Sequence, residues 1–397
     1  MVGMICCFAM PVQAENLVEK PPKFPNKVPD TGQQRCYDSR KVIPCPNPGE
    51  PFFGQDANYT INPPQYSQGT QNDPTILEDQ VTGLTWQTTS DPTGKTWSEA
   101  IDHSHELTLG GFDDWRLPTK MEFQTLMSYG NEPGQLKHPT APLETSALSS
   151  KRACAWTMSN RPFPSLEAKT MCLPDKQGGI SNKYKKQYVY SVRGKSLRYG
   201  IFEPEVRNTV TDKSTGLMWQ TTEVRPLKWQ QALSYCEDLQ LAGFDDWRLP
   251  TIKELATLVE ERLINPAMNT VFFPAARAAA YWTGTTFSGR PGFAWYIRFD
   301  NGLEYNGGYK ERRYFVRAVR NILSEVKVIP VTVPGQTPVT PETQPATSVI
   351  PALKAEQKKK LITPKVDTKE KLKLTVPPEK DLDIYEPYPL DYQLYQE

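Results

Sequence analysis

The alternation of apolar and polar residues predicts a short strand followed by two amphipathic helices in the first third of the chain. The strand covers residues 84–89, where aromatic and β-branched residues follow a Thr-Gly turn. A capping box formed by Thr96 and Glu99 begins the first helix, and one formed by Thr119 and Glu122 begins the second. The apolar residues on the buried helix faces recur with helical spacing: Trp97, Ala100, Ile101, Leu107, Phe123, Leu126 and Met127.

The same pattern occurs a second time along the chain. The segment Thr-Gly-Leu-Thr-Trp-Gln-Thr-Thr at residues 82–89 returns at 215–222 with one change, and Gly-Phe-Asp-Asp-Trp-Arg-Leu-Pro-Thr at residues 111–119 returns unchanged at 243–251. Because nine identical residues at a nearly constant offset are far beyond chance, the chain contains one module twice. We place module 1 at residues 73–206 and module 2 at residues 207–321.

The repeated block is interpreted as structural. Its Asp113-Asp114 and Asp245-Asp246 pairs could bind calcium or act as acid and base, but a carboxylate that accepts turn amides or pairs with Arg116 or Arg248 explains them more simply. The residues assigned to the structural motif are Trp115, Arg116, Thr119, Glu122, Trp247, Arg248, Thr251 and Glu254.

Beyond the second helix, both modules carry a Trp-Thr strand and then an aromatic-rich hairpin. The strands hold Trp156 and Trp282, 126 positions apart, whereas the hairpins at residues 188–199 and 293–305 align with an offset of 106. This difference predicts about twenty extra residues in module 1, around residues 161–183. The hairpin of module 2 is expected to turn at Asp300-Asn301-Gly302, which tolerate left-handed backbone.

The cysteines predict two disulfides and one buried thiol. Cys36 and Cys45 lie close together in a Pro-rich stretch, and Cys154 and Cys172 bracket another, so pairing within each couple would staple segments that lack a core. Cys236 falls on the apolar face of the first helix of module 2, where a small core residue is expected. With three His and no Cys-x-x-Cys, no metal site is expected.

Composition and the two ends bear on location and partners. A net charge of +1 argues against nucleic-acid binding, and no run of residues is apolar for long enough to form a transmembrane span. Residues 1–14 predict a signal peptide, although the basic residues that usually begin one are missing. Either the start codon is assigned too far downstream, or the stretch is an ordinary apolar N-terminus. Lipidation at Cys6 or Cys7 is a minor alternative. Residues 15–72 form a Pro/Gly-rich segment expected to lie against module 1, and residues 322–397 a disordered tail.

Both modules resemble the Lcl C-terminal domain family of bacteria. The shared signature is Thr-Gly-Leu-x-Trp-Gln, an amphipathic helix, Gly-Phe-Asp-Asp-Trp-Arg-Leu-Pro-Thr-x-x-Glu and a Trp-Thr strand. The resemblance implies an α+β, C-type-lectin-like fold with two helices and small antiparallel sheets. An adhesin of the family is associated with sulfated glycosaminoglycans, but this chain lacks its collagen-like stalk. The motif also resembles formylglycine-generating enzymes, whose pair of redox-active cysteines has no counterpart here.

The hairpin of module 2 is the predicted ligand surface, because aromatic faces stack on sugars or anchor proteins, and polar side chains add directional hydrogen bonds. The candidate residues are Trp295, Tyr296, Arg298, Asp300, Asn301 and Tyr305. Since strand residues alternate between faces, we expect Trp282 in the core, and Trp295, Arg298 and Tyr305 exposed. The sequence thus predicts an exported, cofactor-free, non-enzymatic protein that binds glycans or envelope proteins. The alternatives are a structural component of a surface appendage and, less favoured, a formylglycine-generating type of enzyme.

Overall fold

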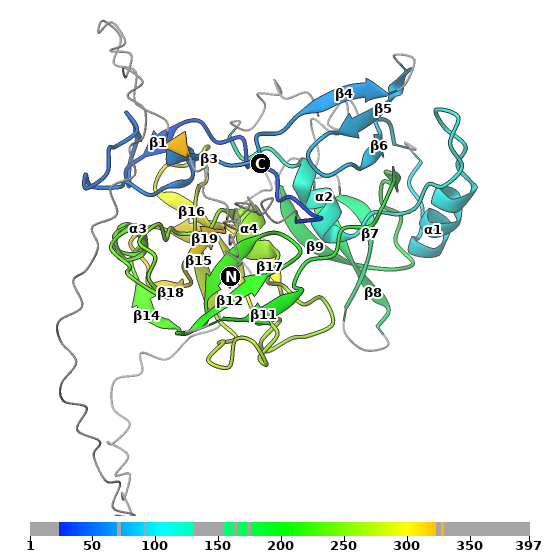
Figure 1. Ribbon diagram of the computed structural model, residues 1–397. Helices are drawn as coiled ribbons and strands as arrows, with labels where there is room; N and C mark the ends of the chain where they lie inside the picture. Colours follow the sequence, from blue (N-terminus) through cyan, green and yellow to red (C-terminus); the bar gives the residue numbers. More distant parts are fainter. Residues whose placement is uncertain are drawn as a thin grey trace, which may run out of the picture. The chain divides into compact units, whose positions relative to one another are not determined.

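The computed structural model describes residues 24–69, 73–90, 93–130, 154–161, 165–172, 176–205, 207–322 and 327–328 (Figure 1). The predicted signal peptide and nearly all of the predicted tail lie outside these ranges. Within them the architecture is α+β, with four α-helices and several small, mainly antiparallel sheets. No helix in the described ranges combines the length and apolar character needed to cross a membrane.

Module 1 contains two helices and two sheets. The strands β5 (Asp73–Asp79) and β6 (Thr85–Gln87) precede α1 (Trp97–Glu106) and α2 (Lys120–Leu126). A three-stranded antiparallel sheet follows, made of β7 (Cys154–Asn160), β8 (Glu167–Cys172) and β9 (Gln177–Asn182). The closing strand β10 (Val192–Arg193) returns to pair with β6.

Module 2 repeats this order. Its first sheet contains β12 (Thr209–Asp212), β13 (Leu217–Gln220) and β19 (Val319–Asn321), together with β11 (Phe202–Pro204), which precedes the predicted module boundary at residue 207. The helices are α3 (Trp229–Glu237) and α4 (Ile252–Ala256). The second sheet has the strand order β14-β18-β15-β16-β17, formed by β14 (Val224–Leu227), β18 (Tyr314–Val316), β15 (Ala280–Thr286), β16 (Phe293–Arg298) and β17 (Leu303–Tyr309).

The strand registers correct the predicted insertion in module 1. Cys154 pairs with Cys172 in β7–β8, and Ala280 pairs with Arg298 in β15–β16, so both pairs keep the same offset of 126 positions. The segment taken as an insertion is the β8–β9 hairpin, which is equivalent to β16–β17 of module 2. The aromatic segment at residues 188–199 instead corresponds to the closing strands, because Val192 pairs with Trp86 as Val319 pairs with Trp219. Repeated aromatic residues had suggested the wrong alignment.

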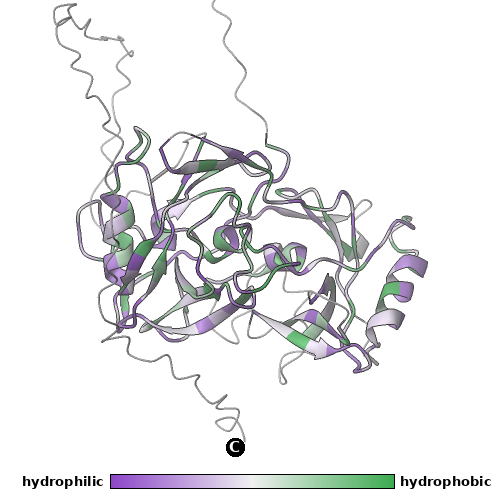
Figure 2. Cartoon of the chain, turned by 90° about the horizontal axis from the view of Figure 1, so that it is seen from below, coloured by the Kyte–Doolittle hydropathy of each residue, from purple (hydrophilic) through white to green (hydrophobic). Residues whose placement is uncertain are grey.

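The helix starts and core positions follow the apolar pattern. Capping boxes are present at Thr96, Thr119 and Thr251, as predicted. The first helix of each module covers its own small core, while one larger core cluster contains residues of both modules, including Phe123 and Leu255. Of α1, only Ala100 and Ser104 are buried, and this helix, at the right of Figure 2, is correspondingly hydrophilic over most of its length.

The N-terminal segment, residues 24–69, contacts both modules rather than module 1 alone. It contains β1 (Cys36–Tyr37), β2 (Val42–Ile43), the short 3-10 helix η1 (Asp56–Asn58), β3 (Tyr59–Thr60) and β4 (Tyr66–Gly69). The Tyr129 amide of module 1 donates to the Thr31 carbonyl at 2.8 Å, while the Gln33 side chain bonds the Thr286 backbone of module 2. A final strand, β20 (Lys327–Val328), pairs with β3.

Candidate functional site

Three tyrosine rings lie together on one face of the five-stranded sheet of module 2. Tyr296 on β16 and Tyr305 on β17 are register partners whose stacked ring centroids are 5.4 Å apart. Tyr314 on β18 lies 4.8 Å from Tyr296, measured between ring centroids. All three side chains are partly exposed, whereas Trp282, whose ring lies 4.2 Å from that of Tyr314, is fully buried as predicted. We call Tyr296, Tyr305 and Tyr314 the tyrosine face.

Strand alternation explains how the tyrosine face forms. Ala294, Tyr296 and Arg298 point to one side of β16, and Arg298 reaches the exposed end of the strand. On β17, Gly308 leaves room for the rings, because a Cβ there would lie 2.5 Å from the Trp282 ring and 2.8 Å from the Tyr296 ring. The face therefore has a buried tryptophan as its base and an arginine at its rim.

The predicted turn at Asp300 and Asn301 fixes the rim of this face. The Arg298 guanidinium is ion-paired with Asp300, and it lies 6.0 Å from the centroid of the Tyr305 ring. The Asn301 amide group donates to the Tyr305 hydroxyl at 2.9 Å, while its carbonyl accepts from the Leu303 amide at 3.0 Å. Asp300 thus orients Arg298, and Asn301 orients Tyr305.

Burial makes ionisation of Tyr296 and Tyr305 still less favourable than in a free tyrosine. Desolvation raises the pKa of Tyr305, although the hydrogen bond from Asn301 and the nearby Arg298 oppose this effect. Burial also raises the pKa of Tyr296, and the neighbouring Tyr314 and Tyr305 add to the shift. At physiological pH the face offers neutral phenol groups, which serve as hydrogen-bond donors and acceptors beside flat apolar rings.

Trp295 does not belong to this surface, and its predicted exposure is wrong. Its side chain is 1% exposed and lies on the opposite side of β16 from Tyr296. There it packs edge-on against Tyr129 of module 1, with ring centroids 5.0 Å apart, and against Phe287. Strand alternation does not say which of the two faces of β16 is buried. Module 1 packs against the face that carries Trp295, so this face is buried.

The repeated motif forms a buried scaffold in both modules. Arg248 makes a two-bond pair with Glu254 at 2.6 and 2.7 Å, and Arg116 makes the same pair with Glu122. Each glutamate also accepts from the backbone amide of its capping threonine. Burial alone would raise the pKa of Glu254, but Arg248 and the hydrogen bonds from Thr251 lower it. Trp115 and Trp247 are buried in the equivalent positions.

The aspartate pairs of the motif have other partners than those predicted. Asp114 pairs with Arg193 at 2.6 Å, and Asp246 pairs with Arg320 at 2.5 Å. Arg116 and Arg248 are occupied by the glutamates, so they are not available to the aspartates. In each module the aspartate ties the turn to the closing strand.

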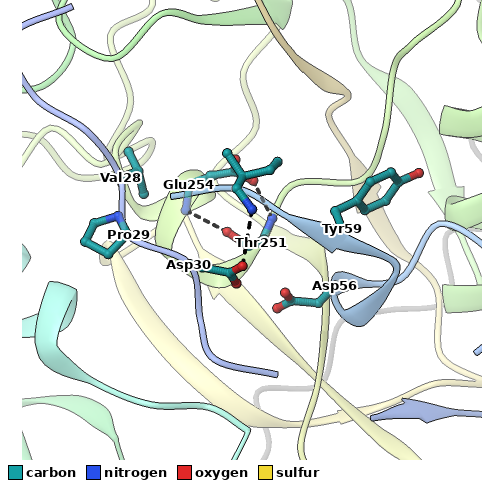
Figure 3. Close-up of a pocket in the computed structure, with 8 residues that line it drawn as sticks. Val28, Pro29, Asp30, Asp56, Tyr59, Thr251 and Glu254 are labelled. Carbon is teal, nitrogen blue, oxygen red and sulfur yellow. Dashed lines mark hydrogen bonds between the residues drawn. The ribbon is translucent and has the colours of Figure 1, made fainter. Parts of the chain in front are cut away.

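A small buried pocket between the N-terminal segment and α4 gathers several charges (Figure 3). It encloses about 10 Å³, and the carboxylates of Asp30 and Asp56 lie side by side next to Thr251 and Glu254. Asp56 accepts hydrogen bonds from the hydroxyls of Thr31 and Thr285. This volume has room for about one water molecule, so the pocket holds no organic ligand.

The charges in the pocket perturb one another. Burial and, to a smaller extent, the adjacent Asp30 together raise the pKa of Asp56 to about 7. Burial lowers the pKa of Lys253 to about 8; its ammonium group donates to the carbonyls of Asp30 and Thr125 at 2.9 and 2.7 Å. Sequence reasoning missed this cluster, because it treated residues 15–72 only as a Pro/Gly-rich segment.

The described cysteines are arranged as predicted. Disulfides join Cys36 to Cys45 and Cys154 to Cys172. Cys236 is the one free thiol in the described part of the chain; it is fully buried, and desolvation raises its pKa well above the usual value. Its equivalent in module 1, Ser104, is also buried and accepts a hydrogen bond from Ser191. A buried thiol with a raised pKa is a poor nucleophile.

The fold and these sites define an α+β protein made of two tandem modules, with an aromatic face on the second. The family model described as the Lcl C-terminal domain matches residues 75–193 and residues 208–320, which together make up more than half of the chain. The chain belongs to this family and contains its domain twice. No curated protein matches the chain.

Proposed function

We propose that this chain is an exported, non-enzymatic binding protein with two C-type-lectin-like modules, and that it recognises a glycan or an envelope protein through the tyrosine face of module 2. The observation that carries the proposal is that only one module has this face. At the positions equivalent to Tyr296, Tyr305 and Tyr314, module 1 has Thr170, Gly179 and Gln187. A shared scaffold does not require these tyrosines.

The chemistry of the face suits ring-shaped ligands. Partly exposed aromatic rings offer flat surfaces for the apolar side of a sugar or for a protein side chain. Arg298, exposed at the rim, adds a directional donor next to Tyr305. A rigid five-stranded sheet holds these groups in place, so little conformational entropy is lost on binding.

Two further observations support the class of protein. Disulfides between Cys36 and Cys45 and between Cys154 and Cys172 favour an oxidising compartment. A formylglycine-generating type of enzyme would need reactive cysteines, whereas the disulfides and the buried Cys236 favour a binding role. Two helices and small antiparallel sheets in each module support the C-type-lectin-like assignment.

A glycan and glycosaminoglycan array tests the proposal with the full chain and two tyrosine variants. Tyr305→Ala removes one ring of the tyrosine face and should lower binding of the selected ligand about tenfold or more, as expected for a central aromatic anchor. Tyr184→Ala is the matched control, because Tyr184 is 75% exposed in module 1, and it should bind normally. Equal binding by all three proteins would contradict the proposal. If every sugar is silent, the same three proteins are compared for capture of envelope proteins.

A further inference from the structure

Each module has a groove beside the start of its second helix. In module 2 the Ile252 amide donates to the Thr285 hydroxyl at 3.0 Å, and in module 1 the Lys120 amide donates to the Ser159 hydroxyl at 2.9 Å. The next strand backbones also match, since the Gly284 amide bonds the Pro250 carbonyl as the Met158 amide bonds the Pro118 carbonyl. The two grooves are therefore built from equivalent residues.

The N-terminal segment fills the groove of module 2. The Thr285 hydroxyl donates to Asp56, and the Gln33 side chain accepts from the Thr286 amide at 3.0 Å and donates to the Thr286 carbonyl at 2.9 Å. The backbone of Asp56 approaches so closely that a Cβ on Gly284 would lie 3.3 Å from the Asp56 nitrogen. Thr285 and Thr286 are fully buried, while their counterparts in module 1 are Ser159, which is 5% exposed, and Asn160, which is exposed. A carboxylate and an amide side chain, from two separate stretches of the N-terminal segment, thus fit this type of groove.

The equivalent groove of module 1 is open among the described residues. It has a volume of about 360 Å³, and Asn160, the counterpart of Thr286, is exposed. The Ser159 hydroxyl accepts from Lys120, and no described residue accepts its proton, whereas Thr285 gives its proton to Asp56. The residues that line the groove are Thr119, Met158, Ser159, Asn160, Arg161, Glu261 and Arg262.

We propose that the groove of module 1 binds an acidic segment of a partner protein, whose carboxylate is held as module 2 holds Asp56 of its own chain. A carboxylate would accept from the Ser159 hydroxyl, and side-chain amides or backbone would pair with Asn160. Arg161 and Arg262 at the rim are ion-paired with Glu167 and Glu260, so the preference for an acidic occupant rests on the Ser159 hydroxyl and not on the charge of the rim. The chain's own segment of this kind is already bound in module 2. This site is separate from the tyrosine face.

The test uses a labelled peptide with the sequence of residues 52–60, which includes Asp56, and fluorescence anisotropy with the full chain. We expect saturable binding that weakens about tenfold or more when the peptide carries Asp56→Asn, because the charged acceptor for the Ser159 hydroxyl becomes a neutral and weaker one. In the protein, Arg161→Glu should weaken binding about fivefold. Arg161 and its partner Glu167 are both about 40% exposed, so this variant should fold normally. Arg225→Glu, at an exposed position on β14 outside the groove, is the matched control and should bind like the wild type.

A photo-crosslinker at the peptide position of Ala57 locates the bound peptide, and residues 158–161 should be labelled. Three results would each overturn the proposal: no saturable binding, equal affinity of the wild-type and Asp56→Asn peptides, or labelling outside residues 158–161. A peptide of residues 381–397, which carries five acidic and no basic residues, is the second arm. If it binds this groove more tightly than the first peptide, the occupant is the chain's own C-terminal segment and the assignment to a partner protein is wrong.

Discussion

Modules 1 and 2 have the same strand registers and the same buried Arg–Glu pairs, yet their second sheets carry different chemistry. Where module 2 has Tyr296, Tyr305 and Arg298, module 1 has Thr170, Gly179 and Cys172, and the cysteine is locked to β7 by a disulfide. In the block that repeats without change, the Trp-Arg-Leu-Pro-Thr stretch forms caps and core, and the exposed Asp-Asp turn is ion-paired with the closing strand. In this duplicated chain, recognition is therefore sought where the copies differ.

The contact between the modules shows a second difference. Trp295 of module 2 is equivalent to Lys169 of module 1, and both are buried where the modules meet. Lys169 lies 3.9 Å from Glu261 of module 2, and burial lowers its pKa. Equivalent positions thus contribute an aromatic anchor from one module and a weakly paired ammonium from the other.

The largest expected effect comes from breaking the buried Arg–Glu pair of module 2. Arg248→Ala should lower the free energy of unfolding by about 3–5 kcal/mol, because Glu254 would be left buried and unpaired. Arg116→Ala should lower the free energy of unfolding clearly less, because the Arg116 side chain is 23% exposed, compared with 3% for Arg248. Denaturant unfolding of both variants measures the difference. Equal losses would show that the two scaffolds are energetically the same.

Truncating Trp295, which packs where the two modules meet, should lower the free energy of unfolding by nearly as much. Trp295→Ala removes a fully buried ring and should destabilise the protein by about 3–5 kcal/mol. Lys169→Met, at the equivalent position of module 1, should change stability by less than about 1 kcal/mol, because a buried ammonium is replaced by an apolar chain of similar length. Thermal unfolding separates these outcomes. A stable Trp295→Ala protein that has only lost ligand binding would return Trp295 to the ligand surface.

Removing the disulfide of module 1 is expected to have a smaller effect. The Cys154→Ser/Cys172→Ser double variant should lose about 3 kcal/mol, because the bond closes a loop of 18 residues. Ligand binding at the tyrosine face of module 2 should persist in conditions where the variant is folded. Loss of that binding in the folded variant would show that the two sheets are coupled.

The smallest expected effect is a dependence of stability on pH through the N-terminal segment. Asp56 has a folded pKa of about 7 against an ordinary 3.8, and Glu237, which accepts from the Tyr59 hydroxyl, has one of about 7 against 4.5. Because both values are raised, their stabilising contribution is complete below about pH 4 and is lost as pH rises through 7. We expect a loss of about 2 kcal/mol between about pH 5 and pH 8, since neighbouring groups titrate together with these carboxyls.

Asp56→Asn provides the control for the pH dependence, because the amide stays neutral over the whole range. This variant should show a shallower fall in the free energy of unfolding between the same two pH values. Burial lowers the pKa of Lys253 to about 8, so its opposite contribution grows only above this window. A stability that rises between about pH 5 and pH 8 would contradict the assigned directions.

Local patterns were enough to predict the module repeat, the helix starts and the disulfides. Capping spacing at Thr119 and Thr251 depends on residues three positions apart, so it is visible in the sequence. The exposure of Trp295 was not predictable, because strand alternation gives two faces without saying which one another module will cover. Asp56 and Lys253 were missed because their burial depends on contacts with residues more than 100 positions away, such as Thr285 and Thr125.

Footprinting with hydroxyl radicals tests the central claim, that module 2 binds the ligand through its tyrosine face, most directly. The full chain is labelled with and without the ligand selected on the array, and oxidation is quantified at each tyrosine by mass spectrometry. The account predicts protection of Tyr296, Tyr305 and Tyr314 with unchanged oxidation of Tyr184. Protection confined to Tyr184, or unchanged oxidation at the tyrosine face in the saturated complex, would contradict it.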